Sequence, residues 1–199
     1  ANTTAGNNVA VGNDALGSNT TGAKNTAIGF EALTANTTAA NNTAVGYAAL
    51  TANTTGTGNI AFGYNALSAN TTSSSNTAVG HNAMAANTTG ENNTAVGLNA
   101  LDGNTTGTRN TTIGYNSQTN STTGNNNTTC GADTMVSLST GHDNTALGAY
   151  ALNSISTGSN SVGIGVSALE ANSTASGNTA IGWHSQMRTT TGSGNISVG

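Results

Sequence analysis

Few side chains of this 199-residue chain could take part in acid–base, nucleophilic or metal chemistry: three histidines, seven acids and one cysteine. Catalysis or metal binding requires several such groups to converge on one point. His81, His142 and His184 occupy three different positions of the sequence repeat described below, so their side chains are expected to point in different directions. The acids are dispersed and form no clustered pair of the kind that glycoside hydrolysis needs. We therefore predict a protein that is not an enzyme and that has no metal or cofactor site.

The elements that position these residues belong to a tandem repeat. One glycine recurs with a strict 17-residue period, far too regularly for chance, and no insertion shifts the register. We predict that residues 1–199 form a single array, with no linker and no second domain. These glycines, taken as position 0 of each repeat, are Gly12, Gly29, Gly46, Gly63, Gly80, Gly97, Gly114, Gly131, Gly148, Gly165, Gly182 and Gly199.

Two positions of the repeat are regularly apolar and are predicted to form the core. Position +4 is usually leucine, as at Leu16, Leu33, Leu50, Leu67 and Leu101, and is glutamine at Gln118 and Gln186. Position −1 is apolar in every repeat, and Cys130 is interpreted there as a small buried hydrophobic side chain. Its members are Val11, Ile28, Val45, Phe62, Val79, Val96, Ile113, Cys130, Leu147, Ile164, Ile181 and Val198.

The period selects an all-β fold, because the repeat is too short for a helical hairpin of about 34 residues and because Asn, Thr and Gly are poor helix formers. We predict a parallel β-solenoid of twelve rungs, one per repeat. Alternation in residues 43–47 places Thr43, Val45 and Tyr47 on one face, which Val45 marks as the buried face. Glycine at position +10, as at Gly56, is expected to need a positive φ.

Self-association is predicted from two observations. Each rung has few large apolar residues relative to the entropy lost in ordering the whole repeat. Alanine recurs at positions −2 and +3, as at Ala44 and Ala49, and small side chains permit neighbouring backbones to approach closely. These features favour a homotrimer.

The charge of the chain excludes several partners. Three Lys and Arg residues against seven acids, with a net charge of −4, do not make the basic surface that nucleic acids require. A basic membrane patch is absent for the same reason. No apolar run approaches the roughly 18 residues of a membrane span, so no membrane insertion is expected. The near absence of cysteine fits an exported fibre stabilised by ladders of side chains.

Asn-Thr-Thr begins at position +7 in many repeats, and three interpretations stay open. The Asn side chains could form a hydrogen-bonded ladder, they could be N-glycosylation acceptors, or a regular Thr array could bind ice. Ser121, Leu138, Ile155 and Thr189 interrupt the position +7 series, which weighs against ice binding. The acceptor pattern also occurs at Asn41, Asn92, Asn110, Asn120, Asn126, Asn127 and Asn195. The position +7 candidates are Asn19, Asn36, Asn53, Asn70, Asn87, Asn104 and, as Asn-Ser-Thr, Asn172.

Two further features suggest surfaces. Position +1 carries aromatic residues such as Tyr47 and Tyr64, which we expect to pack with position −1; if exposed, they could contact carbohydrate. Residues 130–143 and 183–192 depart from the repeat, through drift or as a contact patch between chains. The candidate patch comprises Met135, Val136, Leu138, Ile155 and Trp183.

The repeat unit, as in residues 59–69 and 93–107, resembles repeats of bacterial and phage fibre proteins that carry a C-terminal self-cleaving chaperone. The stretch NSVGIG at residues 160–165 is similar to repeats in the heads of trimeric autotransporter adhesins. The resemblance implies a left-handed β-roll, usually trimeric, in a surface fibre or adhesive head. We therefore predict a structural segment of an extracellular, cell-surface or virion fibre or adhesin, N- or O-glycosylated in one version. It would associate as a homotrimer or filament and contact surface glycans or a host receptor. The alternatives are an ice-binding solenoid and a glycan-binding head.

Overall fold

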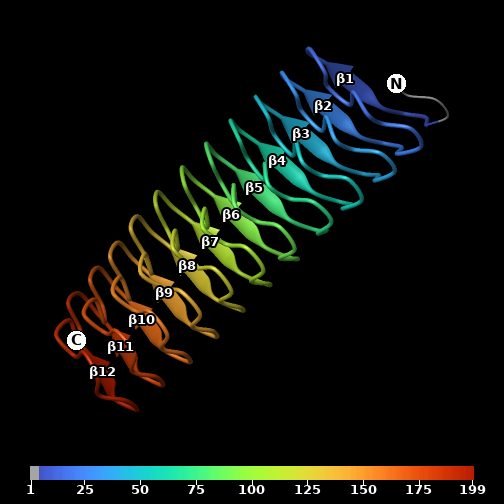
Figure 1. The fold of residues 1–199 in the computed structure, drawn as a ribbon. Coiled ribbons are helices and arrows are strands. Elements are labelled where there is room, and N and C mark those ends of the chain that lie inside the picture. Colours follow the sequence, from blue (N-terminus) through green and yellow to red (C-terminus); the bar gives the residue numbers. More distant parts are fainter. Residues whose placement is uncertain (1–4) are drawn as a thin grey trace.

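In the computed structural model, which describes residues 5–199, the chain coils into a parallel β-solenoid of about eleven turns (Figure 1). Each repeat supplies one three-residue strand, and the twelve strands form one sheet in sequence order. The strands are β1 Val9–Val11, β2 Thr26–Ile28, β3 Thr43–Val45, β4 Ile60–Phe62, β5 Thr77–Val79, β6 Thr94–Val96, β7 Thr111–Ile113, β8 Thr128–Cys130, β9 Thr145–Leu147, β10 Val162–Ile164, β11 Thr179–Ile181 and β12 Ile196–Val198. The predicted all-β parallel β-solenoid with a 17-residue repeat is confirmed.

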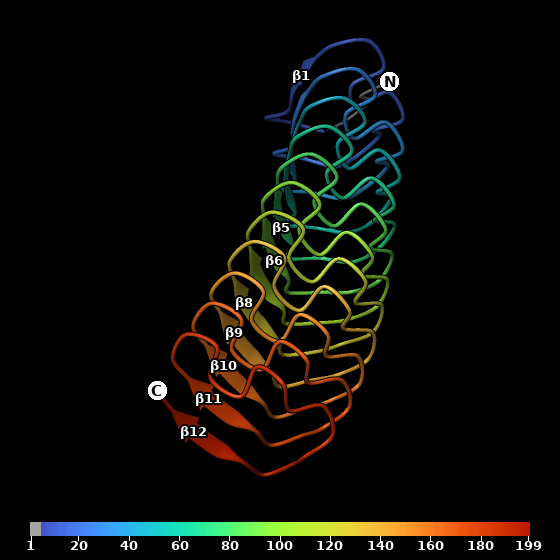
Figure 2. The ribbon, with the colours of Figure 1, turned by 90° about the vertical axis from the view of Figure 1, so that its left-hand side faces the viewer.

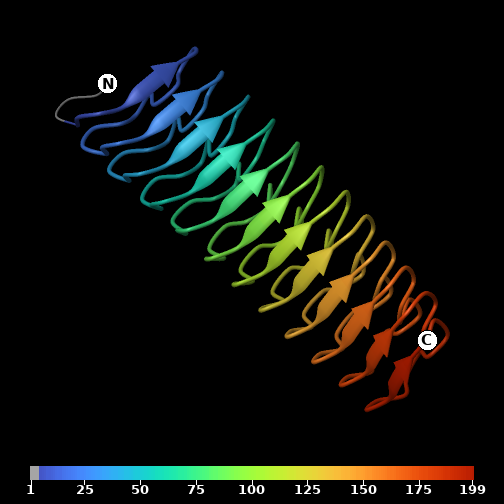
Figure 3. The same cartoon turned by 180° about the vertical axis from the view of Figure 1, so that it is seen from behind.

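The register of the sheet repeats the sequence period. Thr43 lies beside Ile60, Ala44 beside Ala61 and Val45 beside Phe62, and the members of each pair are one repeat apart. All arrows point the same way in Figure 3, and Figure 2 shows the coils of successive rungs stacked on one another along the rod. At the usual spacing of ~4.8 Å between strands, twelve rungs make a rod roughly 50 Å long.

Left-handed backbone conformations turn the chain at fixed positions of each rung. Positions −5, 0, +2 and +4 have positive φ, as at Asn41 (φ 62), Gly46 (φ 137), Ala48 (φ 49) and Leu50 (φ 52). Position 0 must be glycine for a second reason, because a Cβ on Gly46 would collide with the carbonyl oxygen of Gly63 in the next rung. The strand therefore runs between two left-handed corners, at positions −5 and +2.

The expectation that glycine at position +10 has a positive φ is wrong, because Gly56 has none. Gly56 instead lies close to the next rung, and a Cβ at this position would collide with the carbonyl oxygen of Ser73. The remainder of each rung, between position +5 and the next corner, contains turns and bends but no second strand.

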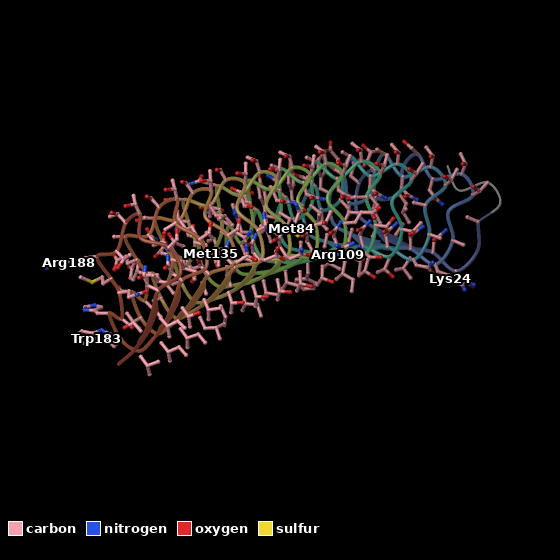
Figure 4. All side chains as sticks on the ribbon, turned by 90° about the horizontal axis from the view of Figure 1, so that it is seen from below. Lys24, Met84, Arg109, Met135, Trp183 and Arg188 are labelled. Atoms are coloured by element: carbon pink, nitrogen blue, oxygen red, sulfur yellow. The ribbon has the colours of Figure 1, made fainter. Side chains whose placement is uncertain are left out.

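The core is formed by positions −2, +3 and +4. Ala44, Ala49 and Leu50 are completely buried, so the predicted position +4 core is confirmed at Leu16, Leu33, Leu50, Leu67 and Leu101. A leucine in the left-handed region costs about 1–2 kcal/mol, and its full burial, at about 1.5–3 kcal/mol, offsets that cost. Figure 4 shows Met84 and Met135, two further position +4 residues, inside the coil. Because the alanines line the interior of one chain, they do not mediate contact between chains, and that argument for a trimer is wrong.

The predicted position −1 core is wrong, because alternation was assigned to the wrong face. Ala44 points inward, so its neighbour Val45 points outward, together with Thr43 and Tyr47. Phe62 is 55% exposed and Cys130 is exposed as well, against the expectation that it is a buried hydrophobic side chain. The same holds for the whole column, whose side chains are exposed or half-buried: Val11, Ile28, Val45, Phe62, Val79, Val96, Ile113, Cys130, Leu147, Ile164, Ile181 and Val198.

Candidate interaction surfaces

The outer face of the sheet carries an apolar stripe, defined here as positions −3, −1 and +1 of every rung. Position −1 is apolar in every rung, whereas position −3 is threonine in eight of the twelve rungs. In the described part of the chain, every exposed large hydrophobic side chain except Tyr150 belongs to these three positions. No Lys, Arg, Asp or Glu occurs in them, and His81 is their one histidine. The alternation of the strands thus produces a buried wall of small residues and an exposed wall of larger apolar ones.

Aromatic rings stack along one side of the stripe. The ring centroids of Phe30, Tyr47, Tyr64 and His81 lie 5.3, 4.9 and 5.0 Å apart in succession, with interplanar angles of 9 to 10°. Position +1 therefore shares its face with position −1, as expected, but the shared face is exposed. Because each ring covers the faces of its neighbours, mainly ring edges are left for a partner, whereas carbohydrates stack on ring faces.

Charged residues lie along the two rims of the stripe, at the corner positions −5 and +2. The position −5 rim holds Lys24, Arg109 and Asp143, and the position +2 rim holds three acids, Asp14, Glu31 and Asp133. Six of the ten charged residues of the chain are thus on these rims. An apolar centre with a polar border is the usual anatomy of a protein–protein interface.

The Asn side chains of position +7 form a buried ladder. Asn36 Nδ2 donates to Asn19 Oδ1 at 2.7 Å and to the carbonyl oxygen of Ala39 at 3.1 Å, and Asn70 Nδ2 donates in the same way to Asn53 Oδ1 at 3.0 Å. These amides are fully buried, which leaves no room for a glycan on the folded rod. The ladder interpretation is confirmed for Asn19, Asn36, Asn53, Asn70, Asn87 and Asn104, whereas the side-chain amide of Asn172 is buried without a hydrogen-bond partner. Burial makes the glycan interpretation wrong for all seven of these residues.

A second buried ladder runs along position −4. Asn42 Oδ1 accepts the backbone N–H of Asn59 at 2.8 Å, and Asn42 Nδ2 donates to the carbonyl oxygen of Gly56 at 2.8 Å. Asn110 and Asn127 belong to this ladder and are equally buried. Among the other acceptor patterns, Asn41, Asn92, Asn120 and Asn126 are exposed.

Threonine at position +9 forms an exposed column. Sequence reasoning raised a regular Thr array but judged its continuity by position +7 and not by position +9. The neighbouring position +8 hydroxyls are used internally, since Thr54 Oγ1 donates to the carbonyl oxygen of Thr71 at 3.1 Å. In the described rungs, the structure gives the position +9 hydroxyls no such bond, although the residue is threonine each time. The signal was available, because position +9 never varies: Thr21, Thr38, Thr55, Thr72, Thr89, Thr106, Thr123, Thr140, Thr157, Thr174 and Thr191.

The predicted contact patch does not exist as a surface. Met135, Leu138 and Ile155 are fully buried and belong to the second of two apolar core clusters. Leu138 and Ile155 replace the inward-pointing Asn of position +7, so apolar packing takes the place of the Asn ladder in those rungs. Val136 is half-buried, and Trp183 is exposed at a distance along the rod, with its ring stacked on His184 at a centroid distance of 4.0 Å.

A polar segment separates the two apolar core clusters. Thr112 Oγ1 donates to Gln118 Oε1 at 2.9 Å, and Ser117 Oγ donates to Thr129 Oγ1 at 2.9 Å. These residues occupy the alanine and leucine positions of other rungs and are fully buried. The same pairing recurs near the end of the array, where Ser185 Oγ donates to Ser197 Oγ at 2.9 Å. A Ser-Gln pair at positions +3 and +4 therefore occurs together with a hydroxyl at position −2 of the following rung.

Apart from the neighbouring pair His142 and Asp143, the titratable side chains of residues 5–199 form no cluster that could bind a metal ion. His81, His142 and His184 are exposed on different rungs, and residues 5–199 contain no group of three His, Cys, Asp or Glu that could hold a metal ion. His142 Nδ1 lies 2.7 Å from Asp143 Oδ2, and hydrogen bonds from His142 and Asn126 hold the pKa of Asp143 below its ordinary value. Burial raises the pKa of Asp102, with a smaller opposing effect from His81. Among residues 5–199, no helix is long and apolar enough to cross a membrane.

Comparisons with known proteins assign no function, so the proposals below are argued from these surfaces. No protein-family model matches the chain, and neither a curated protein nor a solved structure matches it.

Proposed function

We propose that this chain is a structural segment of an extracellular fibre or adhesin, on a cell surface or a virion. The observation that carries the proposal is the register: every strand pairs with the strand of the next repeat, along the whole sheet. Such an array adds ~4.8 Å of length per repeat and holds whatever it carries at a fixed distance. The resemblance to fibre and adhesin repeats supports the same proposal and favours a left-handed coil and three associated copies.

Electron microscopy of the purified chain tests the mechanical part of this proposal. The expected particle is a stiff rod roughly 50 Å long, and a flexible or globular particle would contradict it. Immunogold labelling of the producing cells or virions tests the location. Labelling on outward-projecting filaments is expected, whereas labelling confined to the cell interior would refute the extracellular assignment.

The unbroken position +9 column favours a second candidate, the ordering of water at an ice surface. The interruptions that weighed against ice binding affect the buried position +7, whereas the exposed threonines continue through every described rung from Thr21 to Thr191. Thermal hysteresis of the purified rod is the direct test. Replacing Thr89 and Thr106 by tyrosine should abolish the hysteresis, and a rod with none at any concentration excludes this function.

Glycan attachment remains a proposal for the exposed acceptors only. Asn41 and Asn92 stand at exposed left-handed corners, and the position +9 threonines offer hydroxyls for O-linked sugars. The intact mass of the native material shows whether these residues carry glycans. Added mass in sugar units, mapped to these residues, would support a glycosylated fibre. A mass of 19.3 kDa would show a bare one.

Binding to surface glycans or a host receptor is the adhesive version of the proposal. The stacked rings disfavour a sugar platform along position +1, so Trp183, at 71% exposure, is the better candidate. A glycan array probed with the wild type and with Trp183→Ala would show whether any binding depends on this ring. Binding unchanged by the substitution would exclude the site.

A further inference from the structure

The feature that the proposed function does not yet explain is the apolar stripe. A soluble rod gains nothing from a row of exposed Val, Ile, Phe and Tyr side chains along its full length, and such a surface is an aggregation hazard unless something covers it. We propose that copies of this chain cover it, by associating through their apolar stripes with the rods parallel and in register. This inference rests on the fibre function proposed above and identifies the surface and the partner.

The size of the stripe fits this partner. Twelve rungs at ~4.8 Å and five residues at ~3.3 Å give a face of roughly 50 by 15 Å. The resulting ~800 Å², which includes the threonines of position −3, is what each partner contributes to a standard stable interface. A second copy also has the same spacing of side chains along the rod, so a contact made at one rung can be repeated at all of them.

The charges on the rims favour a parallel orientation. When one copy is rotated about an axis along the rod, its acidic position +2 rim comes to lie opposite the position −5 rim of its neighbour. Lys24 and Glu31 belong to the same rung, so these opposite charges meet at the same height. Asp133 lies one rung from Arg109 and one rung from Asp143 on the facing rim, so its attraction to the first is offset by repulsion from the second. Rotation about an axis across the rod instead brings identical rims together, and with all twelve rungs overlapped no basic residue then meets an acid at its own height. Exposed ion pairs add little affinity, but they select orientation.

The mass measured by sedimentation tests whether the apolar stripe is the surface through which copies associate. The wild type should sediment at two or three times 19.3 kDa. The double variant Phe62→Glu, Ile113→Glu places charges in the stripe at exposed positions of β4 and β7, and burying them unpaired should weaken association by about 100-fold or more. The matched control is Thr72→Glu, Thr123→Glu, which adds the same charges to the position +9 column in the same two rungs.

Association that is lost in the stripe variant and kept in the control would support the proposal, provided that both retain the circular dichroism of the wild type. A wild type that is a single chain at every concentration would overturn it and leave the stripe to a different partner, as would equal association of both variants. Because a single chain would still be a rod in the electron microscope, failure here is distinct from failure of the proposed function.

The one cysteine of the chain reports on orientation. Cys130 is exposed in the centre of the stripe, at position −1 of β8. In a parallel, in-register assembly the Cys130 side chains of facing copies are at equal height, so mild oxidation should link two chains, and Cys130→Ser should prevent the link. In a fully overlapped antiparallel pair, Cys130 of one copy would face the fifth rung of the other copy. The two Cys130 side chains would then be about 14 Å apart along the rod. An assembly that forms but does not cross-link would therefore overturn the parallel orientation.

Discussion

Replacing Leu50 by alanine is predicted to destabilise the rod more than replacing Phe62 by alanine, although Phe62 is the larger side chain. Leu50 is fully buried at position +4, in one column with Leu33 and Leu67. Phe62 lies on the outer face of β4 with 55% of its surface exposed. Each substitution removes a large apolar side chain, so the comparison asks which face of the rung is the interior.

The magnitudes follow from burial. Leu→Ala at a fully buried site costs about 2–5 kcal/mol, because the lost transfer free energy is joined by the cost of the cavity. Full burial of a Phe side chain contributes about 1.5–3 kcal/mol, and Phe62 has less than half of its surface covered, so Phe62→Ala should cost about 1 kcal/mol. If Phe62 were a core residue, the same substitution would cost about 3–5 kcal/mol.

The measurement is urea unfolding at a protein concentration low enough to keep single chains, followed by circular dichroism. Hydrogen exchange of the amides in β3 and β4 should accompany it, because a repeat array can open locally without unfolding as one unit. Leu50→Ala should accelerate exchange strongly and Phe62→Ala only weakly. Equal losses of stability, or a larger loss for Phe62→Ala, would refute the assignment of the interior.

Three further predictions concern polar groups. Asn104 Oδ1 and Ser121 Oγ are buried without hydrogen-bond partners where the position +7 ladder stops, so Ser121→Asn should extend the ladder and stabilise the rod by about 1 kcal/mol in urea unfolding, and an unchanged or lowered midpoint would contradict this. The polar core around Gln118 should open more readily than the apolar clusters, so amides of β7 and β8 should exchange faster than those of β3 to β5, and uniform exchange would exclude a weak segment there. Because burial raises the pKa of Asp102 above 3.8, its penalty on folding is absent below that value and grows as pH rises through the folded pKa. Asp102→Asn should therefore raise the melting temperature at about pH 7 and not at about pH 3, whereas Asp14→Asn, at an exposed site, should do neither; an equal effect at both pH values would contradict the burial argument.

The repeat length and the alternation of residues were sufficient to predict the fold. A constant 17-residue spacing fixes the register of every strand pair, and strand-forming residues in a short repeat leave few alternatives to a solenoid. The Asn ladder was also predictable, because stacking identical amides at the strand spacing satisfies them from rung to rung. Leu50 and its equivalents were assigned correctly because position +4 lies outside the strand, so no choice between the two faces of a strand was needed.

The candidate surfaces could not be predicted in the same way, because hydrophobicity alone does not say which side of a three-residue strand faces inward. Both Ala44 and Val45 are apolar, and the larger one is the natural choice for the core when burial of area is the only criterion. The interior of this rung is too narrow for that choice, since position −2 faces the alanine and leucine of the same coil. Met135, Leu138 and Ile155 were misplaced for the related reason that position +7, polar in most rungs, was assumed to be outside.

Variation among the repeats carries the missing information. Position −2 is never larger than threonine, because the opposite wall of the coil limits the volume at that site. Position −1 ranges from Cys130 to Phe62, a spread of sizes that a close-packed interior would not accept in consecutive rungs. Constancy of volume, more than apolarity, therefore marks the interior of a narrow solenoid. By the same reasoning, an apolar position that is free to vary in size lies outside the coil, where a second rod can adjust to it.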